Sequence, residues 1–411
     1  MTQEMTSEKA IALEHKYGAH NYHPLSVVLA KGEGVKVWDV EGNEYYDFLS
    51  AYSAVNQGHC HPRIVNAIVE QSKTLALTSR AFHSDKLGEA EQFMAEFFGY
   101  DKVLMMNTGA EANETAIKVA RKWGYEKKGI PSNEAVIVVV DGNFHGRTVT
   151  IISASTDPVA TTNFGPFTPG FEIVPYNDIP ALEKALANPN VCGFLVEPIQ
   201  GEAGVYVPEH GYLKKASEIC KKNNVILMMD EVQTGIGRTG KMLAADHENI
   251  KPDMIILGKA VSGGAYPVSA VLADNDIMTV LKPGQHGSTY GGNPVACAVA
   301  MEALSVIKEE KLTENAQAMG EIFRARMQEI IAKTDLVTLV RGKGLLNAII
   351  INDSPESETA WNICVAMKEN GLLAKPTHGN IIRFAPPLVM TETQIHECCD
   401  IIEKTVLNFK K

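Results

Sequence analysis

Six short apolar segments between residues 102 and 273 constrain the fold of this 411-residue chain more than any other feature. They lie at residues 102–107, 135–142, 193–198, 225–231, 254–258 and 268–273, and most are apolar on both alternating faces. Strands of this kind are buried on both sides, under helices on each face of a sheet. The segments at 111–129 and 211–224 have helical periodicity and end near Gly or Asn. The pattern predicts an α/β fold with a doubly wound, mostly parallel sheet, whose ligands bind at the carboxyl ends of its strands.

Both ends of the chain differ from this central region in their pattern of apolar and polar residues. Residues 33–49 predict two short strands joined by a turn, and a long helical segment near residue 300 leads into shorter α/β pieces. We expect the two ends to fold together as a smaller α/β domain. The predicted divisions are an N-terminal segment of the small domain at 1–52, a large domain at 53–299 and a C-terminal small domain at 300–411.

Composition and charge argue against several classes of function. A net charge of −11, with no Lys/Arg run longer than a pair, argues against binding to nucleic acids or anionic membranes. No apolar run approaches the ~18 residues of a membrane span. The N-terminal residues have the character of neither a signal peptide nor a transit peptide. The seven cysteines contain no CxxC motif, so we expect no disulfide framework, no zinc site and a cytoplasmic location.

A lysine stands directly after one of the apolar strands. In DMIILGKAVSGG (253–264), Lys259 follows four apolar residues and a glycine. Burying an ammonium group costs free energy. Such a lysine therefore either reaches solvent with its long side chain or is kept for its amine, as a nucleophile or a Schiff-base former.

Two further features stand at the ends of neighbouring strands. Asp230 ends the apolar run VILMMD, and Gly109 opens a helix after VLMM, where free N–H groups and the helix dipole favour a phosphate. Each has an ordinary structural alternative, as a helix cap or a simple turn. Together with Lys259 they supply what pyridoxal phosphate needs: an anchored phosphate, a partner for the protonated ring nitrogen and an amine.

Two other motifs are weaker evidence for a binding site. Gly235-x-Gly237-x-x-Gly240 has the form of a dinucleotide fingerprint, but it begins several residues after its strand ends. The acidic pair Asp230-Glu231 also stands before the glycines, whereas the acidic residue of the fingerprint follows them. We expect a glycine-rich loop near the active site there. In GHCHP, His59 and His61 have no further ligand at suitable spacing, so we expect a turn and no metal.

With these residues assembled, the chain resembles the class III, fold-type I, pyridoxal-phosphate-dependent aminotransferases over almost its whole length. The resemblance lies in YGAHNYHPL, WDVEGNEYYDFLSAYSAVNQGHCHP, VEPIQGEAGV, DEVQTGIGRTG, LGKAVSGGAYPVSAVL, HGSTYGGNP, RGKGLLNA and GLLAKPTHGNIIRFAPPL. The segments GAHNYHP and AKPTHGNIIRFAPPL are the most particular, because they are typical of family members that act on ornithine.

The resemblance implies a cofactor site for pyridoxal 5'-phosphate. Lys259 would form the Schiff base and move the proton, and Asp230 would keep the pyridine nitrogen protonated. The remaining implied contacts are the backbones of Gly109 and Ala110 and the side chains of Ser288 and Thr289 at the phosphate, Phe144 on the ring and Gln233 at the phenolic oxygen. Ser288 and Thr289 would reach the neighbouring subunit's site, which implies a homodimer.

The resemblance also implies a substrate and a way to select it. A ping-pong reaction would move the δ-amino group of L-ornithine to 2-oxoglutarate, giving glutamate and glutamate 5-semialdehyde, which cyclises to pyrroline-5-carboxylate in arginine and proline metabolism. Arg383 would bind the carboxylate next to the reacting carbon of glutamate or 2-oxoglutarate. Glu202 would pair with Arg383 while ornithine is bound, and Tyr22 and Arg147 would hold ornithine's remote carboxylate.

One residue departs from the pattern, and three other functions stay open. His145 stands where eukaryotic ornithine-specific members tend to have Trp, which leaves the packing beside the cofactor open. The alternatives are another class III ω-aminotransferase (for acetylornithine, 4-aminobutyrate or lysine), an NAD-dependent oxidoreductase, and a catalytically silent binding protein. The intact Lys259, Asp230 and Arg383 argue against the last.

Overall fold

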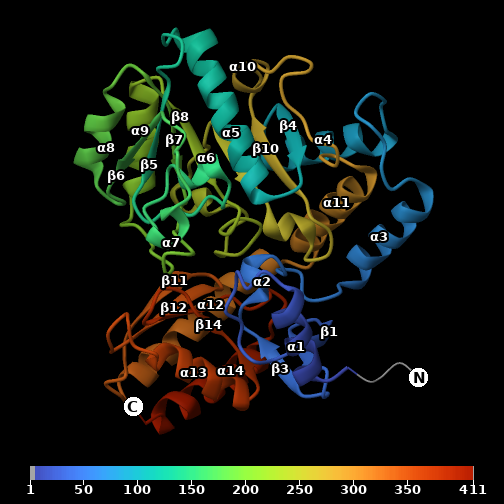
Figure 1. Ribbon diagram of the computed structural model, residues 1–411, viewed down its shortest axis with the longest axis vertical. Helices are drawn as coiled ribbons and strands as arrows, with labels where there is room; N and C mark the ends of the chain where they lie inside the picture. The colour runs from blue at the N-terminus through green and yellow to red at the C-terminus, as the bar shows by residue number, and fades with distance from the viewer. Residues whose placement is uncertain (1–4, 411) are drawn as a thin grey trace.

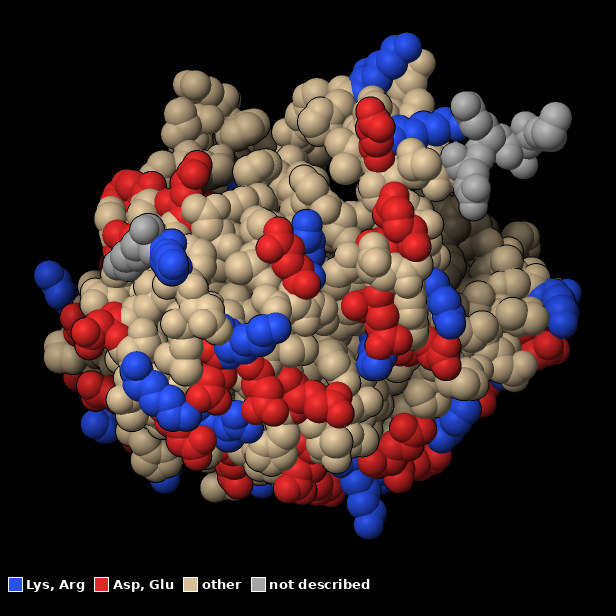
Figure 2. Space-filling model, turned by 90° about the horizontal axis from the view of Figure 1, so that it is seen from below, with Lys and Arg blue, Asp and Glu red and all other residues tan. Residues whose placement is uncertain are grey.

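A computed structural model gives the structure of residues 5–410. A seven-stranded sheet forms the centre of the upper part in Figure 1, and two four-stranded sheets lie in the lower part. None of the described helices is both long and apolar enough to cross a membrane. On the face seen from below in Figure 2, acidic and basic side chains are interspersed.

The seven-stranded sheet confirms the predicted fold class. Its order is β4 (Lys102–Met106), β10 (Ser269–Ala273), β9 (Met254–Leu257), β8 (Ile226–Asp230), β7 (Val191–Val196), β5 (Val136–Val140) and β6 (Phe171–Val174). β10 runs antiparallel to β4 and β9, and the pairs from β9 to β6 are parallel. Strand β6 was not predicted, because its four residues alternate in polarity only briefly at the sheet edge.

Helices bury both faces of this sheet, which explains why its strands are apolar on both sides. The helices of the upper part are α3 (Pro62–Thr74), α4 (Asp85–Phe98), α5 (Gly109–Trp123), α6 (Val149–Ile152), α7 (Pro158–Thr161), α8 (Ile179–Leu186), α9 (Tyr212–Lys222), α10 (Asn275–Met278) and α11 (Pro294–Glu309). A π-helical turn, Gly124–Lys128, extends α5. Small residues of α5, including Ala112 and Ala116, pack in one of the two large hydrophobic clusters.

The lower part is built from both ends of the chain. One sheet contains β1 (Leu29–Glu33), β2 (Lys36–Asp39), β3 (Glu44–Asp47) and β13 (Leu372–Leu373), and β13 pairs in parallel with β3. The other contains β11 (Val337–Lys343), β12 (Leu346–Ile351), β15 (Ile381–Phe384) and β14 (Lys375–Pro376). The helices are α1 (Ser7–Tyr17), α2 (Ser50–Ser53), α12 (Leu312–Ile331), α13 (Thr359–Glu369) and α14 (Glu392–Asn408).

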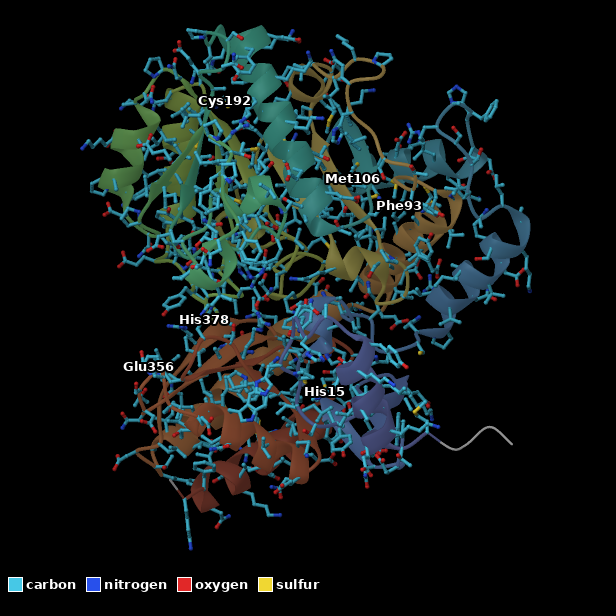
Figure 3. The ribbon with its side chains drawn as sticks, in the orientation of Figure 1. His15, Phe93, Met106, Cys192, Glu356 and His378 are labelled. Atoms are coloured by element: carbon cyan, nitrogen blue, oxygen red, sulfur yellow. The ribbon has the colours of Figure 1, made fainter. Side chains whose placement is uncertain are left out.

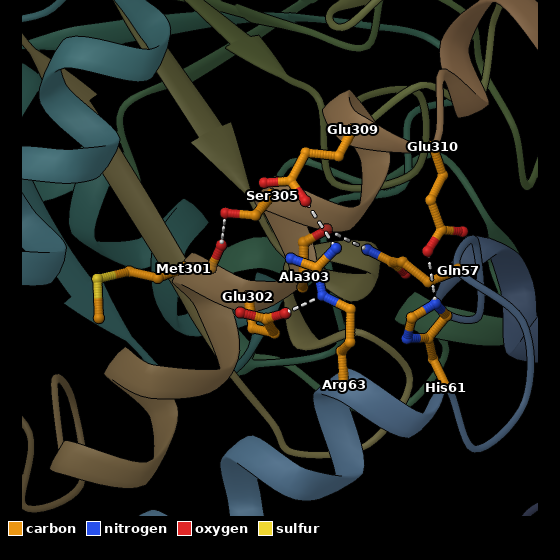
Figure 4. A network of polar contacts seen from close by, with 9 residues as sticks. All are labelled: Gln57, His61, Arg63, Met301, Glu302, Ala303, Ser305, Glu309 and Glu310. Carbon is orange, nitrogen blue, oxygen red and sulfur yellow. Dashed lines mark hydrogen bonds and ion pairs between the residues drawn. The ribbon is translucent and has the colours of Figure 1, made fainter.

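The domain divisions at residues 1–52, 53–299 and 300–411 stay a prediction. The division between residues 299 and 300 falls inside α11, which packs on α3 and α4 of the upper part. Figure 4 shows polar contacts that join this helix to α3 and the turn before it: Arg63 reaches Glu302 and Glu309, and His61 reaches Glu310. The other histidine of this turn, His59, contacts Asp47, with 2.7 Å between Nε2 and Oδ2.

The glycine-rich loop at residues 235–240 connects the two parts. From this loop, Arg238 donates through Nη1 to the carbonyls of Leu345 (2.9 Å) and Pro386 (2.6 Å), and through Nη2 to Oδ1 of Asn56 (2.6 Å). Gly344, at φ 52°, lies so close that a Cβ there would be 2.3 Å from the carbonyl carbon of Thr239. The loop therefore holds the upper part against the lower part beside the carboxyl ends of the strands.

Candidate active site

Lys259 lies just beyond the end of β9, where it begins a 3₁₀ turn, Lys259–Ser262. Its backbone is in the left-handed region, at φ 44°, a conformation that costs free energy for a residue with a side chain. Burial lowers the pKa of its amine below the ordinary value; the nearby guanidinium of Arg383 acts in the same direction and the carboxylate of Glu202 opposes it. The neutral, nucleophilic form of the amine is therefore easier to reach here than in an exposed lysine.

Asp230 ends the neighbouring strand β8, and its side chain is buried. Its Oδ2 accepts from Nδ2 of Asn113 (2.9 Å) and Nδ1 of His145 (2.7 Å), and its Oδ1 accepts from the N–H of Val232 (3.0 Å). Although burial lowers the pKa of His145, the Asp230 carboxylate more than offsets this and raises the pKa overall. The carboxyl group of Asp230 is thus buried and held in one orientation, and Nε2 of His145 is buried without a hydrogen-bond partner among residues 5–410.

Lys259 and Asp230 line one cavity of about 170 Å³, the inner cavity, at the carboxyl ends of the strands. Its walls are Gly109, Ala110, Asn113, Phe144, His145, Gly146, Glu197, Asp230, Val232, Gln233 and Lys259. Helix α5 begins in this wall, with Thr108 and Glu111 forming a reciprocal cap on its first turn. A Cβ on Gly109 would lie 2.9 Å from Cγ1 of Val232, so the helix start can approach only as glycine. This N-terminus can hold an anion such as a phosphate.

Beside the cavity, Glu202 and Arg383 form an ion pair with 2.9 Å between Oε1 and Nη1. The same Nη1 donates to Oε1 of Gln233 (3.1 Å) and to the carbonyl of Gly201 (3.2 Å), and Nε2 of Gln233 donates to Oε1 of Glu202 (3.1 Å). Although burial raises the pKa of Glu202, Arg383 and Lys259 lower it overall. The guanidinium of Arg383 also lies 5.1 Å from the ring centroid of Tyr52. Arg383 is thus a buried cation whose charge partner, Glu202, has a side chain that is 22% exposed.

A second cavity of about 510 Å³, the outer cavity, adjoins the inner cavity and shares Phe144, His145 and Gly146 with it. Its wall comes from residues 142–160 and 202–206 of the upper part and from residues 355 and 378–381 of the lower part. Figure 3 labels His378 at this junction. The second cavity therefore lies between the two parts and beside the cavity that Lys259 lines.

Four predicted residues lie away from the inner cavity within one chain. Tyr22 is 72% exposed, Thr289 is exposed and Oγ of Ser288 accepts a hydrogen bond from Nδ2 of Asn107 (2.8 Å). Arg147 has a side chain that is 55% exposed, with its guanidinium 5.5 Å from the ring centroid of Phe144. The predicted partner of Gln233 was a cofactor oxygen, whereas its amide here bridges Glu202 and Arg383.

Sequence reasoning missed three residues at the site. Glu197 follows β7 as directly as Asp230 ends β8, so the same rule could have found it; burial raises its pKa to about 8, and its Oε2 accepts from the N–H of Phe144 (2.9 Å). Gln57 donates to the carbonyls of Ala260 (3.0 Å) and Ala303 (3.1 Å). Tyr52 lies in a left-handed turn, for which no local sequence signal exists.

Comparisons with known proteins agree with this geometry. The family described as aminotransferase class-III matches residues 17–406. The mitochondrial ornithine aminotransferase of Drosophila ananassae is 61% identical over 402 residues, which cover 98% of this chain and 92% of that protein. The crystal structure of acetylornithine aminotransferase from Elizabethkingia anophelis is 63% identical, with a TM-score of 0.91 over 98% of this chain and 100% of that one.

A third relative links the fold to a cofactor. A structure of the ornithine aminotransferase from Toxoplasma gondii, described as having partial occupancy of PLP at its active site, is 50% identical and has a TM-score of 0.97, covering 98% of this chain and 95% of that one. The predicted resemblance is confirmed by a match over nearly the whole sequence and by high identity. This protein therefore belongs to the class III aminotransferase family.

Proposed function

We propose that the protein transfers the δ-amino group of L-ornithine to 2-oxoglutarate with pyridoxal 5'-phosphate as its cofactor. The observation that carries this proposal is the ion pair between Glu202 and Arg383 beside Lys259. Ornithine must react through its distal amine, with its carboxylate far from the reacting atoms, whereas 2-oxoglutarate reacts beside a carboxylate. An arginine that is paired in one half-reaction and free in the other serves both substrates.

The residues of the inner cavity fit the cofactor. The start of α5 at Gly109 and Ala110 is suited to the phosphate, the carboxylate of Asp230 to a protonated ring nitrogen, and Phe144 to the face of the ring. Lys259 would hold the cofactor covalently through its amine. When bound, pyridoxal phosphate supplies the aldehyde that takes up the amino group and the ring that accepts electrons.

The chain's own residues then divide the work of the two half-reactions. With ornithine bound, Glu202 keeps Arg383 occupied, and Tyr22 and Arg147 bind the remote carboxylate. Once Lys259 is released, its amine moves the proton at the reacting carbon of the substrate. With 2-oxoglutarate bound, Glu202 turns away and Arg383 binds the adjacent carboxylate. The products are glutamate 5-semialdehyde, which cyclises to pyrroline-5-carboxylate, and glutamate.

A second candidate substrate is N-acetyl-L-ornithine. The observation that favours it is the 63% identity to a structure described as an acetylornithine aminotransferase. This molecule presents the same distal amine and the same carboxylate, so the Glu202–Arg383 pair serves it equally well. The two substrates differ in the α-nitrogen, which is a cation in ornithine and a neutral amide in N-acetylornithine.

A substrate panel on the purified enzyme tests the proposal. L-ornithine, N-acetyl-L-ornithine, 4-aminobutyrate and L-lysine are each assayed with 2-oxoglutarate, and o-aminobenzaldehyde detects the cyclic product of ornithine. We expect the highest kcat/KM with ornithine and a coloured adduct. A higher kcat/KM with N-acetylornithine or 4-aminobutyrate would reject the assignment in favour of another ω-aminotransferase.

Replacing the lysine tests the cofactor assignment. Because Lys259 is the proposed covalent attachment point, Lys259→Ala should lose the absorbance of the attached cofactor and turnover, and retain the circular dichroism of the folded protein. Normal turnover by this variant would reject the assignment.

We propose further that the enzyme is a homodimer in the cytoplasm. Thr289 and Tyr290 are exposed, which supports a role for this segment at a neighbouring subunit's site. All seven cysteines are unpaired and six are buried, which suits a reducing compartment. Sedimentation analysis and cell fractionation test these two points. A monomer with full activity would reject the shared site, and recovery in an organelle would reject the location.

A further inference from the structure

The outer cavity contains a carboxylate that no step described so far uses. Asp157 lines this 510 Å³ space together with Glu202, and Glu202 already pairs with Arg383. The side chain of Asp157 is 28% exposed, and its Oδ2 lies 4.0 Å from Nη2 of Arg147. The two opposite charges therefore form a long ion pair with no hydrogen bond between these two atoms.

The local structure holds the Asp157 carboxylate in one place. Its Oδ1 accepts from the N–H of Val159 (2.9 Å), and its own N–H donates to Oγ of Ser155 (3.1 Å). The preceding residue, Thr156, donates through Oγ1 to Oδ1 of Asp141 (2.6 Å). Oδ1 is therefore occupied by the backbone, whereas Oδ2 makes the long contact to Arg147 and can accept a hydrogen bond from a cationic ligand without rearrangement of the loop. A preorganised group of this kind loses little entropy on binding.

Arg147 lies against Asp157 and Phe144, two residues of the wall of this cavity, and we propose above that it binds ornithine's carboxylate. Its guanidinium is near both the Phe144 ring, at 5.5 Å from the centroid, and the Asp157 carboxylate. In ornithine, the α-ammonium and the α-carboxylate are attached to the same carbon. A cation and an anion fixed side by side on the protein match these two charges in the crossed sense, Arg147 to carboxylate and Asp157 to ammonium.

We propose that Asp157 binds the α-ammonium group of ornithine and is a specificity-determining residue for free diamino acids. This inference rests on the proposed function, since it takes the distal amine as the reacting one. N-acetyl-L-ornithine has a neutral amide in place of the ammonium, and 5-aminopentanoate has a hydrogen there. Both retain the distal amine and a carboxylate for Arg147, so they isolate the contribution of Asp157.

Asp157→Asn in the holoenzyme is the direct test. Asparagine caps a helix turn about as well as aspartate, so the loop should keep its conformation. Loss of one charge-assisted contact predicts a fall of about 10- to 100-fold in kcat/KM for ornithine, mainly through KM. With 5-aminopentanoate, N-acetyl-L-ornithine and glutamate, kcat/KM should stay within about twofold of wild type, because these reactions do not use the contact.

Asp178→Asn is a matched control. Asp178 caps α8 in the same way, through a bond from the N–H of Ala181 to its Oδ1 (2.9 Å), and it does not line the outer cavity. This variant should leave kcat/KM unchanged for every substrate. Both variants remove one negative charge, so a difference between them reports position and not net charge.

Three outcomes would overturn the inference: an equal fall with ornithine and 5-aminopentanoate, which indicates a structural role; no fall with ornithine; or the same fall in Asp178→Asn. Failure of the proposed function is visible separately, in wild-type enzyme that prefers N-acetylornithine to ornithine. In that case the ratio of kcat/KM for ornithine to that for 5-aminopentanoate still decides the role of Asp157, since it should fall in Asp157→Asn.

Discussion

Glu202, Gln233 and Arg383 form a closed set of hydrogen bonds at the carboxyl end of the sheet, with all three donor–acceptor distances between 2.9 and 3.1 Å. The set is tightly confined, because a Cβ on Gly201 would lie 1.9 Å from Oε1 of Gln233. Arg383 is fixed and buried, whereas the Glu202 side chain is 22% exposed. Glu202 is therefore the more accessible partner of the ion pair, as the proposed exchange with a substrate carboxylate requires.

Glu202→Ala should make Arg383 available at all times. Reaction of the α-amine of glutamate should then increase relative to δ-transfer from ornithine, by about tenfold or more, since a charge-assisted bond contributes ~1.5–3 kcal/mol. Cofactor absorbance during each half-reaction gives both rates. The exposed Glu209 in the same segment is a matched control, and Glu209→Ala should leave the ratio unchanged. An unchanged ratio in Glu202→Ala would discard the role of Glu202.

Glu231 gives a prediction on pH and stability. Burial is the main cause that raises its pKa to about 7, from an ordinary value of 4.5, although Thr234 and the N–H of Ala245 donate to it. The folded state thus holds the proton more tightly than the unfolded state. The resulting stabilisation is complete below about pH 4.5 and is lost as the pH rises through about 7.

Glu231→Gln removes this titration. The free energy of unfolding of the variant relative to wild type should rise between pH 5 and pH 8 by on the order of 1–3 kcal/mol. Urea unfolding at both pH values measures it, with the exposed Glu218→Gln as a control that should show no such change. A difference that falls with pH would have the wrong sign for a buried carboxyl group.

At the scale of elements, turns in unusual conformations position the site. Residues Ser50–Ser53 all have positive φ, between 46° and 71°, and Lys259 begins its 3₁₀ turn at φ 44°. Gln57 links these regions, because its amide donates to the carbonyl of Ala260 in the Lys259 turn and to that of Ala303 in α11, as Figure 4 shows for Ala303. The tertiary contacts of this amide help to hold the turn that carries the lysine.

Gln57→Leu should loosen that turn. We expect the free energy of unfolding to fall by about 1 kcal/mol and the pH midpoint of the bound cofactor's absorbance to shift by about half a unit or more. Gln71→Leu is the control: this buried amide also donates to a backbone carbonyl, that of Leu75 at 3.0 Å, but at the end of α3. It should lose similar stability and leave the absorbance midpoint in place. Identical midpoints in both variants would reject a positioning role for Gln57.

The central sheet could be predicted from the sequence, because burial on both faces leaves a continuous apolar pattern and polar residues then mark strand ends. That reasoning located Asp230 and Lys259. Tyr52 could not be found in this way, since a run of four residues other than glycine at positive φ has no recognisable sequence pattern. The roles of Tyr22, Ser288 and Thr289 came from family resemblance, and they stay predictions because these side chains do not line the inner cavity within one chain.

At the scale of the whole molecule, the outer cavity takes its wall from both the upper and the lower part, so its geometry depends on how the two parts are joined. Arg238 is fully buried and makes three hydrogen bonds to groups of other segments. Burial lowers its pKa to about 9, yet it remains a cation at neutral pH. The carbonyl of Pro386 that it holds is three residues from Arg383, so this contact also supports β15, the strand that carries Arg383.

Arg238→Met should therefore weaken the junction. Removing three buried hydrogen bonds predicts a loss of about 3 kcal/mol or more in the free energy of unfolding. Arg324→Met is the control, because Arg324 donates to Gly344 and Asn347 within the lower part alone. It should lose less stability and leave KM for 2-oxoglutarate unchanged, whereas Arg238→Met should raise that KM. Thermal unfolding and steady-state kinetics provide both numbers, and wild-type values for Arg238→Met would contradict this view of the junction.

The most direct test of the account is to find where the cofactor is attached. Reduction of the purified enzyme with borohydride, followed by digestion and mass spectrometry, should give one modified peptide, with the mass of reduced pyridoxal phosphate on Lys259. Addition of ornithine before the reduction should remove that modification, because the substrate's amine displaces the lysine. A modification on another lysine, or none at all in an enzyme that remains active, would contradict the central claim.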